Sequence, residues 1–413
     1  MSKLEKLIQQ YCPDGVEYVR LGDVMSIQRG ASPRPIQNYL TDDEYGIPWI
    51  KIGDVSIESK YITSTKERVT KEGAAKSRFL KRGSFILSNS MSFGRPYILE
   101  IDGCIHDGWI SMCDFEKHLL PDFLYYLLRS SVVQDFWISK ANSGGAVTNL
   151  NSDIVRSTLI PVPPLPVQEE IVRVLDTFTE LQAELQAELQ KRLQQYNYYR
   201  DNLLTNFTPE QAPKEYTLGE VTVDIYSGAT PSKEKREYWV NGTIPWMSSG
   251  EVNLGQVYEV EGRITQLGYD KCSTKMVPEG SVVIALAGQG KTRGTVAILR
   301  TSVCTNQSLA ALVPQKEIVS GEYLYYYLKT QYAKLREVSA GDGTRGGLNL
   351  KMLKAYKVVI PSHKAQDQIV AILDRFDTLT TDLTQGLPAE IEKRRQQYEF
   401  YRDKLLTFKR KEA

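Results

Sequence analysis

The sequence predicts an α+β protein in which a mixed domain followed by a long helical segment occurs twice. Two pairs of segments carry this prediction. QQYNYYRDNLLT (Gln194–Thr205) recurs as QQYEFYRDKLLT (Gln396–Thr407), identical at nine of twelve positions, and QEEIVRVLDTF from Gln168 recurs as QDQIVAILDRF from Gln366. A period of about 200 residues is far longer than that of a solenoid repeat, so the chain reads as a duplicated domain-plus-helix unit with pseudo-two-fold character.

The stretches upstream of these helices, about 18–160 and about 216–360, are mixed in character. Short β-like runs alternate with turns rich in Gly, Asn, Ser and Pro. One helix closes each stretch, PDFLYYLLRSSVVQDFW from Pro121 and GEYLYYYLKTQYAKLREV from Gly321. We therefore expect two compact α+β domains, each with a twisted sheet.

Paired tryptophans and cysteines extend the repeat into these domains. IPWIKIGDV contains Trp49, IPWMSSGEV contains Trp246, and Cys104 lies 200 residues before Cys304. Large aromatic side chains at matched positions are more typical of a core than of a base-stacking platform. We expect both tryptophans to anchor the cores and both cysteines to pack in matching strands.

The two repeated segments predict long helices. In the first, apolar residues from Ile171 to Leu203 recur nine times over 32 residues, about 3.6 residues per step. The proline cluster IPVPPLP ends the preceding domain, and we expect Gln168 to open the helix. In the second, Gly386 and Pro388 predict a break, with Pro388 starting a new helix.

The apolar stripe of each helix needs a partner. The repeat favours the duplicate helix, packed antiparallel as in a coiled coil, and the alternative is that each helix packs only on its own domain. The motif YRD, at Tyr199 and again at Tyr401, leaves two interpretations open. Its arginines, Arg200 and Arg402, form local ion pairs or meet a partner protein, and we favour the structural role.

Composition gives no sign of a highly charged or secreted protein. The chain has 51 basic and 50 acidic residues, so any DNA contact must come from local clustering of charge. Five cysteines form no C-x-x-C pair, which fits thiols in a reducing cytosol better than a zinc site or disulfides. The N-terminal MSKLEKLIQQYCPDG lacks the apolar core of a signal peptide, and no run of about 18 apolar residues occurs. We expect a cytoplasmic protein without a metal site.

The segment VVIALAGQGKT (Val282–Thr292) resembles a strand entering a phosphate-binding loop, with Ala285 in place of the leading glycine. Its counterpart in the first copy, GSFILSNSMSFGRPYIL from Gly83, has no G-K-T. The residues that follow, RGTVAILRTSV, alternate and are β-branched, so they predict a return strand rather than a helix. We interpret the segment as a glycine-rich hairpin tip and not as an NTPase site.

Two related domains on a rigid helical spacer suit a ligand with two-fold symmetry, and duplex DNA is the common one. The domains differ in their polar loops, so the two half-sites should differ as well. Arg and Lys favour guanine, Asn and Gln favour adenine, and Ser and Thr serve either base. The alternative for each candidate is a solvated loop residue or a phosphate contact. The candidates are Arg29, Ser32, Arg34, Lys51, Asn89, Ser90 and Arg95 in the first domain, and Thr230, Ser232, Lys233, Ser248, Gln289, Lys291, Arg293 and Arg345 in the second.

The order of domain, helix, domain, helix resembles the specificity subunit of type I restriction-modification enzymes over essentially the whole chain. The resemblance rests on PLPVQEEIV, LPAEIEKRRQQYEFYRDKLLTF, QYCPDGVEYVRLGDV and the tandem QAELQAEL of the first helix. It implies target recognition domains at 1–160 and 211–360, each reading one half of a bipartite asymmetric DNA target. It also implies two long antiparallel conserved spacer helices, at 161–210 and 361–413, which separate the domains and set the unread gap.

By the same resemblance, the helices bind two methyltransferase subunits that carry S-adenosylmethionine and methylate adenine N6. Restriction subunits with ATP- and Mg-dependent motor and nuclease activities can then join. This chain has no N/D-P-P-Y/F tetrapeptide and no glycine-rich cofactor loop after a first strand. We therefore expect a non-catalytic subunit without a cofactor of its own. A coiled-coil scaffold that never reads DNA remains the alternative.

Overall fold

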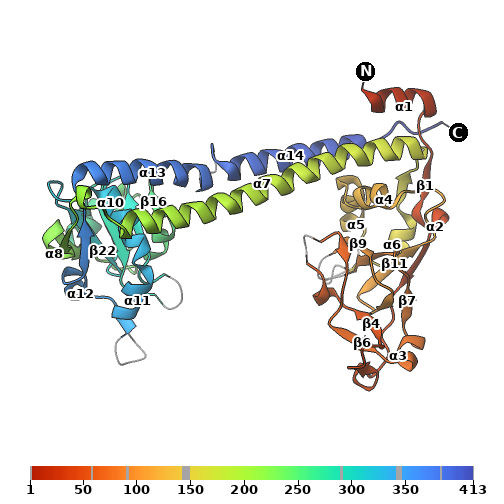
Figure 1. Ribbon diagram of the computed structural model, residues 1–413, viewed down its shortest axis with the longest axis horizontal. Helices are drawn as coiled ribbons and strands as arrows, with labels where there is room; N and C mark the ends of the chain where they lie inside the picture. Colours follow the sequence, from red (N-terminus) through yellow and green to blue (C-terminus); the bar gives the residue numbers. More distant parts are fainter. Residues whose placement is uncertain are drawn as a thin grey trace. The chain divides into compact units, whose positions relative to one another are not determined.

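The protein is described by a computed structural model that covers residues 2–56, 59–89, 93–141, 149–288, 292–340, 347–381 and 384–412 (Figure 1). Contacts divide the chain into two units. Unit 1 comprises Met1–Gln186 and Glu390–Ala413, and unit 2 comprises Ala187–Ala389. Each unit contains one mixed α+β domain and segments of the long helices, which confirms the predicted fold class.

Within the described residues, the domain of unit 1 has two five-stranded sheets, ordered β2-β11-β8-β9-β5 and β3-β6-β4-β10-β7, and the pair β1-β12. The strands are β1 Tyr18–Arg20, β2 Ser26–Arg29, β3 Leu40–Thr41, β4 Ile47–Ile50, β5 Tyr61–Ile62, β6 Glu67–Val69, β7 Arg78–Leu80, β8 Phe85–Ser88, β9 Pro96–Leu99, β10 Gly103–Ile105, β11 Trp109–Cys113 and β12 Leu159–Pro161. The helices are α1 Lys3–Tyr11, α2 Leu21–Val24, α3 Lys71–Ala75, α4 Pro121–Leu128, α5 Ser131–Ala141 and α6 Ser152–Ser157, with the first part of α7 Leu165–Thr205 and most of α14 Leu387–Leu405.

The domain of unit 2 repeats this plan in the part of the chain that is described. Its sheets are ordered β14-β22-β19-β20-β16 and β17-β15-β21-β18, with the pair β13-β23. The strands are β13 Lys214–Thr217, β14 Thr222–Ser227, β15 Ile244–Met247, β16 Gln256–Val257, β17 Arg263–Ile264, β18 Met276–Val277, β19 Val282–Ala285, β20 Val296–Leu299, β21 Val303–Thr305, β22 Leu309–Pro314 and β23 Lys357–Ile360. The helices are α8 Leu218–Val221, α9 Gln266–Asp270, α10 Gly321–Thr330, α11 Tyr332–Ala340, α12 Leu350–Lys354 and α13 His363–Thr381, with the second part of α7.

The matched tryptophans and cysteines lie in the cores, as predicted. Trp49 of β4 is the register partner of Cys104 in the parallel strand β10, and Trp246 of β15 is the partner of Cys304 in β21. All four side chains are buried. The same strand pair therefore forms one layer of each domain, which shows that the repeat in sequence is a repeat in structure.

The helix predicted to close each domain is two helices. Helix α4 ends at Leu128, before the polar residues 129–131, and Ser130 Oγ donates to the carbonyl of Leu127 (2.7 Å) at that end. Asp403 of α14 then accepts from the backbone N–H of Ser131 (3.1 Å), where α5 begins. In unit 2, α10 and α11 are likewise separate. The prediction of a single helix was therefore wrong in both units. In unit 1, a local contact of Ser130 and a distant contact from Asp403 meet at the break.

Helix α7 begins at Leu165, three residues before the predicted start at Gln168. Pro166 fits the first turn because its missing N–H would have no partner there. Gln168 instead ties the helix to its domain: the fully buried amide accepts from Leu120 N (2.9 Å) and donates to the carbonyls of His118 (2.8 Å) and Pro163 (2.7 Å). Gln366 makes the equivalent three hydrogen bonds in unit 2.

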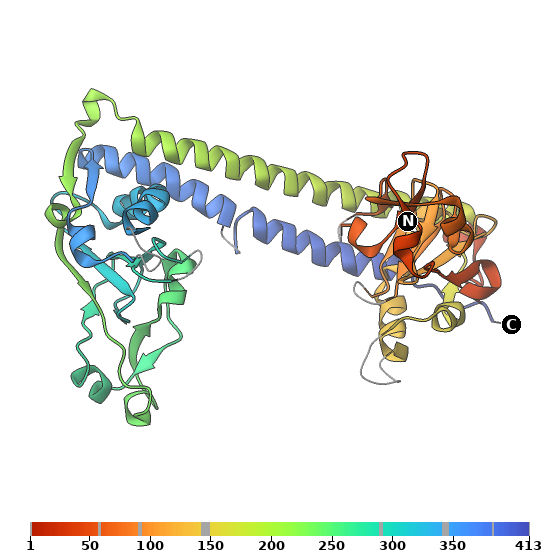
Figure 2. The ribbon, with the colours of Figure 1, turned by 90° about the horizontal axis from the view of Figure 1, so that it is seen from below.

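The second helical segment breaks where Gly386 and Pro388 predict it. Helix α13 ends at Thr381, and α14 begins at Leu387. Figures 1 and 2 show α7 beside α14 within unit 1 and beside α13 within unit 2. In unit 1, α7 starts at the domain and α14 ends there, so the two run antiparallel.

Aromatic side chains pack the helices in each unit. Phe178 of α7 stacks on Tyr401 of α14, with ring centroids 5.6 Å apart, and Tyr199 of α7 stacks on Phe376 of α13 at 5.7 Å. The two pairs are equivalent in the repeat. Both tyrosines belong to the YRD motif, so this motif places an aromatic ring between the helices of each unit.

The segment that resembles a phosphate loop belongs to a hairpin. Strands β19 and β20 pair antiparallel, so a return strand follows Thr292, as predicted, and not the helix that a phosphate loop requires. None of the helices in the described ranges is long and apolar enough to cross a bilayer.

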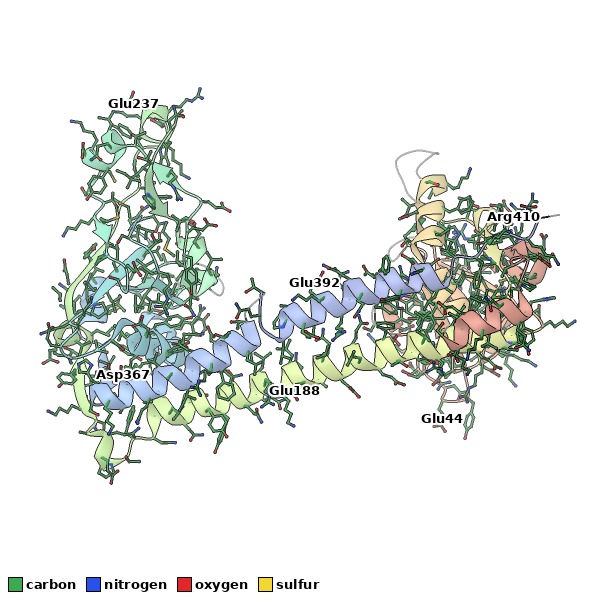
Figure 3. All side chains as sticks on the ribbon, turned by 90° about the horizontal axis from the view of Figure 1, so that it is seen from above. Glu44, Glu188, Glu237, Asp367, Glu392 and Arg410 are labelled. Atoms are coloured by element: carbon green, nitrogen blue, oxygen red, sulfur yellow. The ribbon has the colours of Figure 1, made fainter. Side chains whose placement is uncertain are left out.

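The C-terminal residues return to the first domain. Val16 and Arg410 form a parallel bridge, and Lys411 N donates to the carbonyl of Val16 (3.0 Å). Figure 3 labels Arg410 beside the domain of unit 1. The end of α14 is thereby attached to the start of the domain on which it packs.

Candidate nucleic-acid interface

In unit 1, Asp107 lies in the short loop between β10 and β11 and accepts hydrogen bonds from four of the predicted DNA-contacting residues. We call this group, Asp107 with Arg29, Ser32, Arg34 and Asn89, the Asp107 cluster. The carboxylate of Asp107 accepts from Ser32 Oγ (2.8 Å) and from Arg34 Nη2 (3.3 Å). Its backbone carbonyl accepts from Arg29 Nε (2.9 Å) and Asn89 Nδ2 (3.0 Å). Loops that are far apart in the sequence therefore converge on this one residue.

The charge of Asp107 is held in place by its neighbours. The hydrogen bond from Ser32 is the largest cause that keeps the pKa of Asp107 below its usual value, and the nearby His106 and Arg29 act in the same direction. Burial lowers the pKa of His106, so this ring is neutral near pH 7. Of the two arginines, Arg34 therefore pairs with a carboxylate, whereas Arg29 donates to the backbone carbonyl of the same residue.

A tight backbone approach brings these loops together. A Cβ on Gly30 would lie 2.0 Å from the carbonyl oxygen of His106, and a Cβ on Gly228 would lie 1.8 Å from that of Thr305. Any other residue would push the loop after β2, or its counterpart after β14, away from its neighbour. These glycines explain why RGASP and SGATP match in the two copies.

The Asp107 cluster borders a cavity of about 650 Å³. Lys51 also lines this cavity and forms an ion pair with Glu67. Asn149 and Asn151, from the segment that leads into α6, face the same space. The lining thus offers guanidinium, ammonium and amide groups, which are the groups that read base edges and hold phosphates.

Arg95 does not join this cluster. It lies at the other arm of the β8–β9 hairpin and lines a separate cavity with Arg129 and Arg402. Ser90 lies outside the described residues. Of the seven candidates in the first domain, the structure therefore brings together Arg29, Ser32, Arg34, Lys51 and Asn89.

In unit 2, Gln307 occupies the position of Asp107. Its Oε1 accepts from Thr230 Oγ1 (2.6 Å), just as Asp107 accepts from Ser32 in unit 1. The arginines of the first copy are replaced, since Ser227 and Ser232 stand where unit 1 has Arg29 and Arg34. The counterpart of the aspartate cluster is therefore an uncharged pair.

The other candidates of the second domain are placed as follows. Ser248 precedes a short 3-10 helix, and its Oγ donates to the carboxylate of Glu251 in that helix (2.8 Å). This hydrogen bond is a structural role for Ser248. Ser232 and Lys233 are exposed, and the carbonyl of Ser232 accepts from Trp239 Nε1. Arg293 follows the β19–β20 hairpin tip, and its carbonyl accepts from Arg336. Gln289, Lys291 and Arg345 lie outside the described residues.

Sequence reasoning missed Asp107, Gln307, Asn149 and Asn151. The sequence could have indicated Asp107 and Gln307. The segments CIHDG and CTNQS begin at the matched cysteines, and they have these two different residues at the same position. An aspartate in such a loop also fits an ordinary turn, and only the fold shows that it meets residues 29–34 and 89.

Comparison with known proteins shows the family to which this chain belongs. The family model described as the type I restriction modification DNA specificity domain matches residues 13–195 and again 213–393. The chain belongs to this family. It is 36% identical over 319 residues to the type I restriction enzyme EcoR124I/EcoR124II specificity subunit of Escherichia coli, covering 74% of each chain. It is 32% identical over 301 residues to a putative specificity subunit of Haemophilus influenzae, covering 69% of this chain and 72% of the relative.

Solved structures of type I specificity subunits share the fold. The chain superposes on the HsdS subunit from Thermoanaerobacter tengcongensis with a TM-score of 0.55 at 20% identity, covering 96% of both chains. A chain from a study of type I system assembly gives a TM-score of 0.68 at 21% identity, covering 96% of this chain and 98% of the other. The two matched family domains coincide with the structural repeat, so each copy is one DNA specificity domain with its helix.

Proposed function

We propose that this specificity subunit reads a bipartite, asymmetric DNA target, one half-site with the domain of each unit. The observation that carries the proposal is the difference between two equivalent clusters. Unit 1 offers Arg29 and Arg34 around Asp107, and unit 2 offers Thr230 with Gln307. Because the donors and charges differ, equal half-sites would not satisfy both. The arginines favour guanine acceptors in the half-site of unit 1.

The long helices serve, in this proposal, as the spacer that sets the unread gap and as the surface for two methyltransferase subunits. Helix α7 is continuous from Leu165 to Thr205 and contains both Q-A-E-L units. Forty-one helical residues extend about 60 Å. Aromatic stacking supports the pairing of the helices within each unit.

The chemistry belongs, in the same proposal, to partner subunits in the cytoplasm. Methyltransferase subunits supply S-adenosylmethionine and methylate adenine N6, and the base must leave the duplex to enter their pocket. Restriction subunits add ATP- and Mg-dependent cleavage. The chain itself selects the site and needs no cofactor. Its five cysteines are free thiols, which suits a reducing compartment.

The test is to co-express the chain with its methyltransferase partner and to map methylated adenines. One extra Q-A-E-L unit inserted after Leu185 adds four residues, or about 6 Å of helix. The gap should lengthen while both half-sites stay the same. Gln186→Ala, which keeps the length of α7, is the matched control and should leave the gap unchanged.

Altered half-site bases with an unchanged gap would contradict the spacer proposal. The scaffold alternative makes a different prediction, since a chain that never reads DNA would give a complex without sequence preference. A specific complex should also lose affinity steeply with salt.

A further inference from the structure

A cavity of about 680 Å³ in unit 2 lies at the start of two helices. Gly321, the first residue of α10, and His363, the first residue of α13, both line it. Ser281, which directly precedes β19, lines it as well. None of the predicted DNA-contacting residues in the described ranges is part of this lining. The cavity is therefore separate from the candidate nucleic-acid interface.

The first turn of α10 supplies main-chain donors to this cavity. Ser320 caps the helix: its Oγ accepts from Tyr323 N (3.2 Å), and its own N–H donates to Gln366 Oε1 (2.9 Å). The N–H groups of Gly321 and Glu322 lie in the turn where a helix provides no acceptor of its own. The helix dipole adds partial positive charge at the same place, so this end of α10 favours an anion.

Ser281 adds a side-chain donor that nothing in the described part of the chain uses. It is only 1% exposed, and its buried hydroxyl has no hydrogen-bond partner there. In unit 1 the equivalent Ser84 forms a hydrogen bond with the thiol of Cys113, whereas Val313 stands at that position in unit 2. Buried polar groups without a partner are rare in folded proteins. Unit 2 has kept the hydroxyl and lost its protein partner, which leaves this group available to a ligand.

The charged side chains of the lining balance each other. Arg300 pairs with Glu322 (2.6 Å), so the carboxylate in the first turn of α10 is neutralised. Lys316 and Glu279 are both exposed. The two helix starts therefore determine the sign of the potential in the cavity, and that sign is positive.

The equivalent place in unit 1 lacks the donors. Helix α4 begins with Pro121, which has no N–H, and its N-cap Leu120 provides no side-chain cap. The lining of unit 1 is also more acidic. It has two cations and four carboxylates at the equivalent positions, which are Lys81, Arg82, Glu100, Asp114, Glu116 and Asp122. An anion is therefore favoured in unit 2 and not in unit 1.

We propose that this cavity of unit 2 binds a phosphate group, either free or as part of a small phosphate ester. The phosphate oxygens accept from the N–H groups at the start of α10 and from the Ser281 hydroxyl, and Lys316 supplies a counter-charge. A phosphate has several acceptor oxygens, so it can serve main-chain and side-chain donors at once. The proposal does not depend on the proposed function, because the cavity lies outside the candidate interface.

The experiment measures the binding of sodium phosphate, and separately of ribose 5-phosphate, to the full chain by titration calorimetry at constant ionic strength. Three variants each change one feature. Ser281→Ala removes the hydroxyl, Lys316→Glu introduces the residue of unit 1, and Val313→Cys gives Ser281 the neighbour that Ser84 has. The control is Lys334→Glu, which makes the same charge change at an exposed position of α11 outside the lining.

The wild type should bind phosphate saturably at millimolar concentration. Ser281→Ala should raise Kd about tenfold, on the scale of one hydrogen bond to a charged group. Lys316→Glu and Val313→Cys should each raise Kd about fivefold, because one repels the anion and the other gives the hydroxyl a competing partner. The control should match the wild type. Tighter binding of ribose 5-phosphate than of phosphate would identify an ester as the ligand, and equal or weaker binding a free phosphate.

Three outcomes would overturn the proposal. The first is a wild type that shows no saturable binding of either compound. The second is a phosphate affinity that stays the same in Ser281→Ala and in Lys316→Glu; because Lys316 is exposed, its variant decides the matter even if Ser281→Ala unfolds unit 2. The third is a loss of the methyltransferase partner, with phosphate binding unchanged, which would show that the cavity takes an acidic side chain of that partner.

Discussion

The domains of the two units bury the same polar contacts but differ at the centre of the candidate interface. Gln168 and Gln366 each make three equivalent hydrogen bonds to their domain. Tyr126 donates to Asp176 (2.5 Å) in unit 1, and Tyr326 donates to Asp374 (2.6 Å) in unit 2. By contrast, unit 1 has a charged cluster around Asp107, and the equivalent place in unit 2 has the uncharged pair Thr230 and Gln307.

The difference shows where the fold constrains the sequence. A buried amide or phenol must keep its partners, because each buried polar group left without one costs about 1–3 kcal/mol. The loop after β10 or β21 needs only a close backbone approach, which the glycines at 30 and 228 provide. Its next residues are therefore open to changes of charge that alter readout without altering the domain.

The largest expected effect comes from the shared framework. Gln168→Leu and Gln366→Leu each leave three main-chain groups without their partner, and each should lower the stability of its own unit by about 3 kcal/mol. Hydrogen exchange of the amides in β8 and β11, compared with those in β19 and β22, reports the two units separately. Gln190→Leu, at an exposed position of α7, is the control. If the two variants lowered the stability of their units by unequal amounts, the two glutamines would not have equivalent roles.

Much of this framework could be predicted from the sequence, since it depends on local patterns. The break before α14 follows from Pro388, which cannot donate a backbone hydrogen bond, and the core positions of Trp49 and Trp246 follow from their size and spacing. The contact of Asp403 with Ser131 at the break between α4 and α5 could not be predicted, because 272 residues separate the two.

The candidate site was predictable only in part, for the same reason. Residue types singled out Arg29, Ser32, Arg34 and Asn89, but not the aspartate that joins them. The contacts of Asp107 span up to 78 residues of sequence, so no local pattern reveals them. Residue type also grouped Arg95 with the others, whereas the hairpin places it in a separate cavity.

The next largest effect tests the difference between the copies. Asp107→Gln gives unit 1 the residue of unit 2, and Arg34 and Ser32 lose a charged acceptor. Discrimination at the half-site of unit 1 should fall by about 2 kcal/mol, or about thirtyfold, while the other half-site keeps its preference. Mapping of methylated adenines measures both at once. The exposed Glu116→Gln serves as control, and a change at both half-sites would show that Asp107 acts on folding rather than on readout.

A smaller effect is expected in unit 2, where the cluster carries no charge. Gln307→Ala removes the acceptor of Thr230 and should weaken selection at the half-site of unit 2 by about 1 kcal/mol, or about fivefold. Gln307→Glu retains an acceptor oxygen and should preserve the position of Thr230. The same methylation maps decide this, and a loss as large as that of Asp107→Gln would contradict the contrast drawn between the copies.

The smallest effect concerns one framework position that differs. Glu170 is buried beneath α1, where it pairs with Lys3 (2.7 Å) and Arg173 (2.6 Å), whereas its counterpart Gln368 is exposed. The hydrogen bond from Arg173 is the largest cause that lowers the pKa of Glu170 to about 2.

Because the folded pKa of Glu170 lies below its ordinary value, the ion pairs contribute fully above about pH 4.5 and are lost as pH falls toward 2. Both cations are largely exposed, so the contribution is about 1 kcal/mol or less. Protection factors of the α1 amides should decrease between pH 5 and about 2.5 in the wild type and stay level in Glu170→Gln. Equal acid sensitivity in the variant would show that other groups, and not this carboxylate, hold α1 against the start of α7.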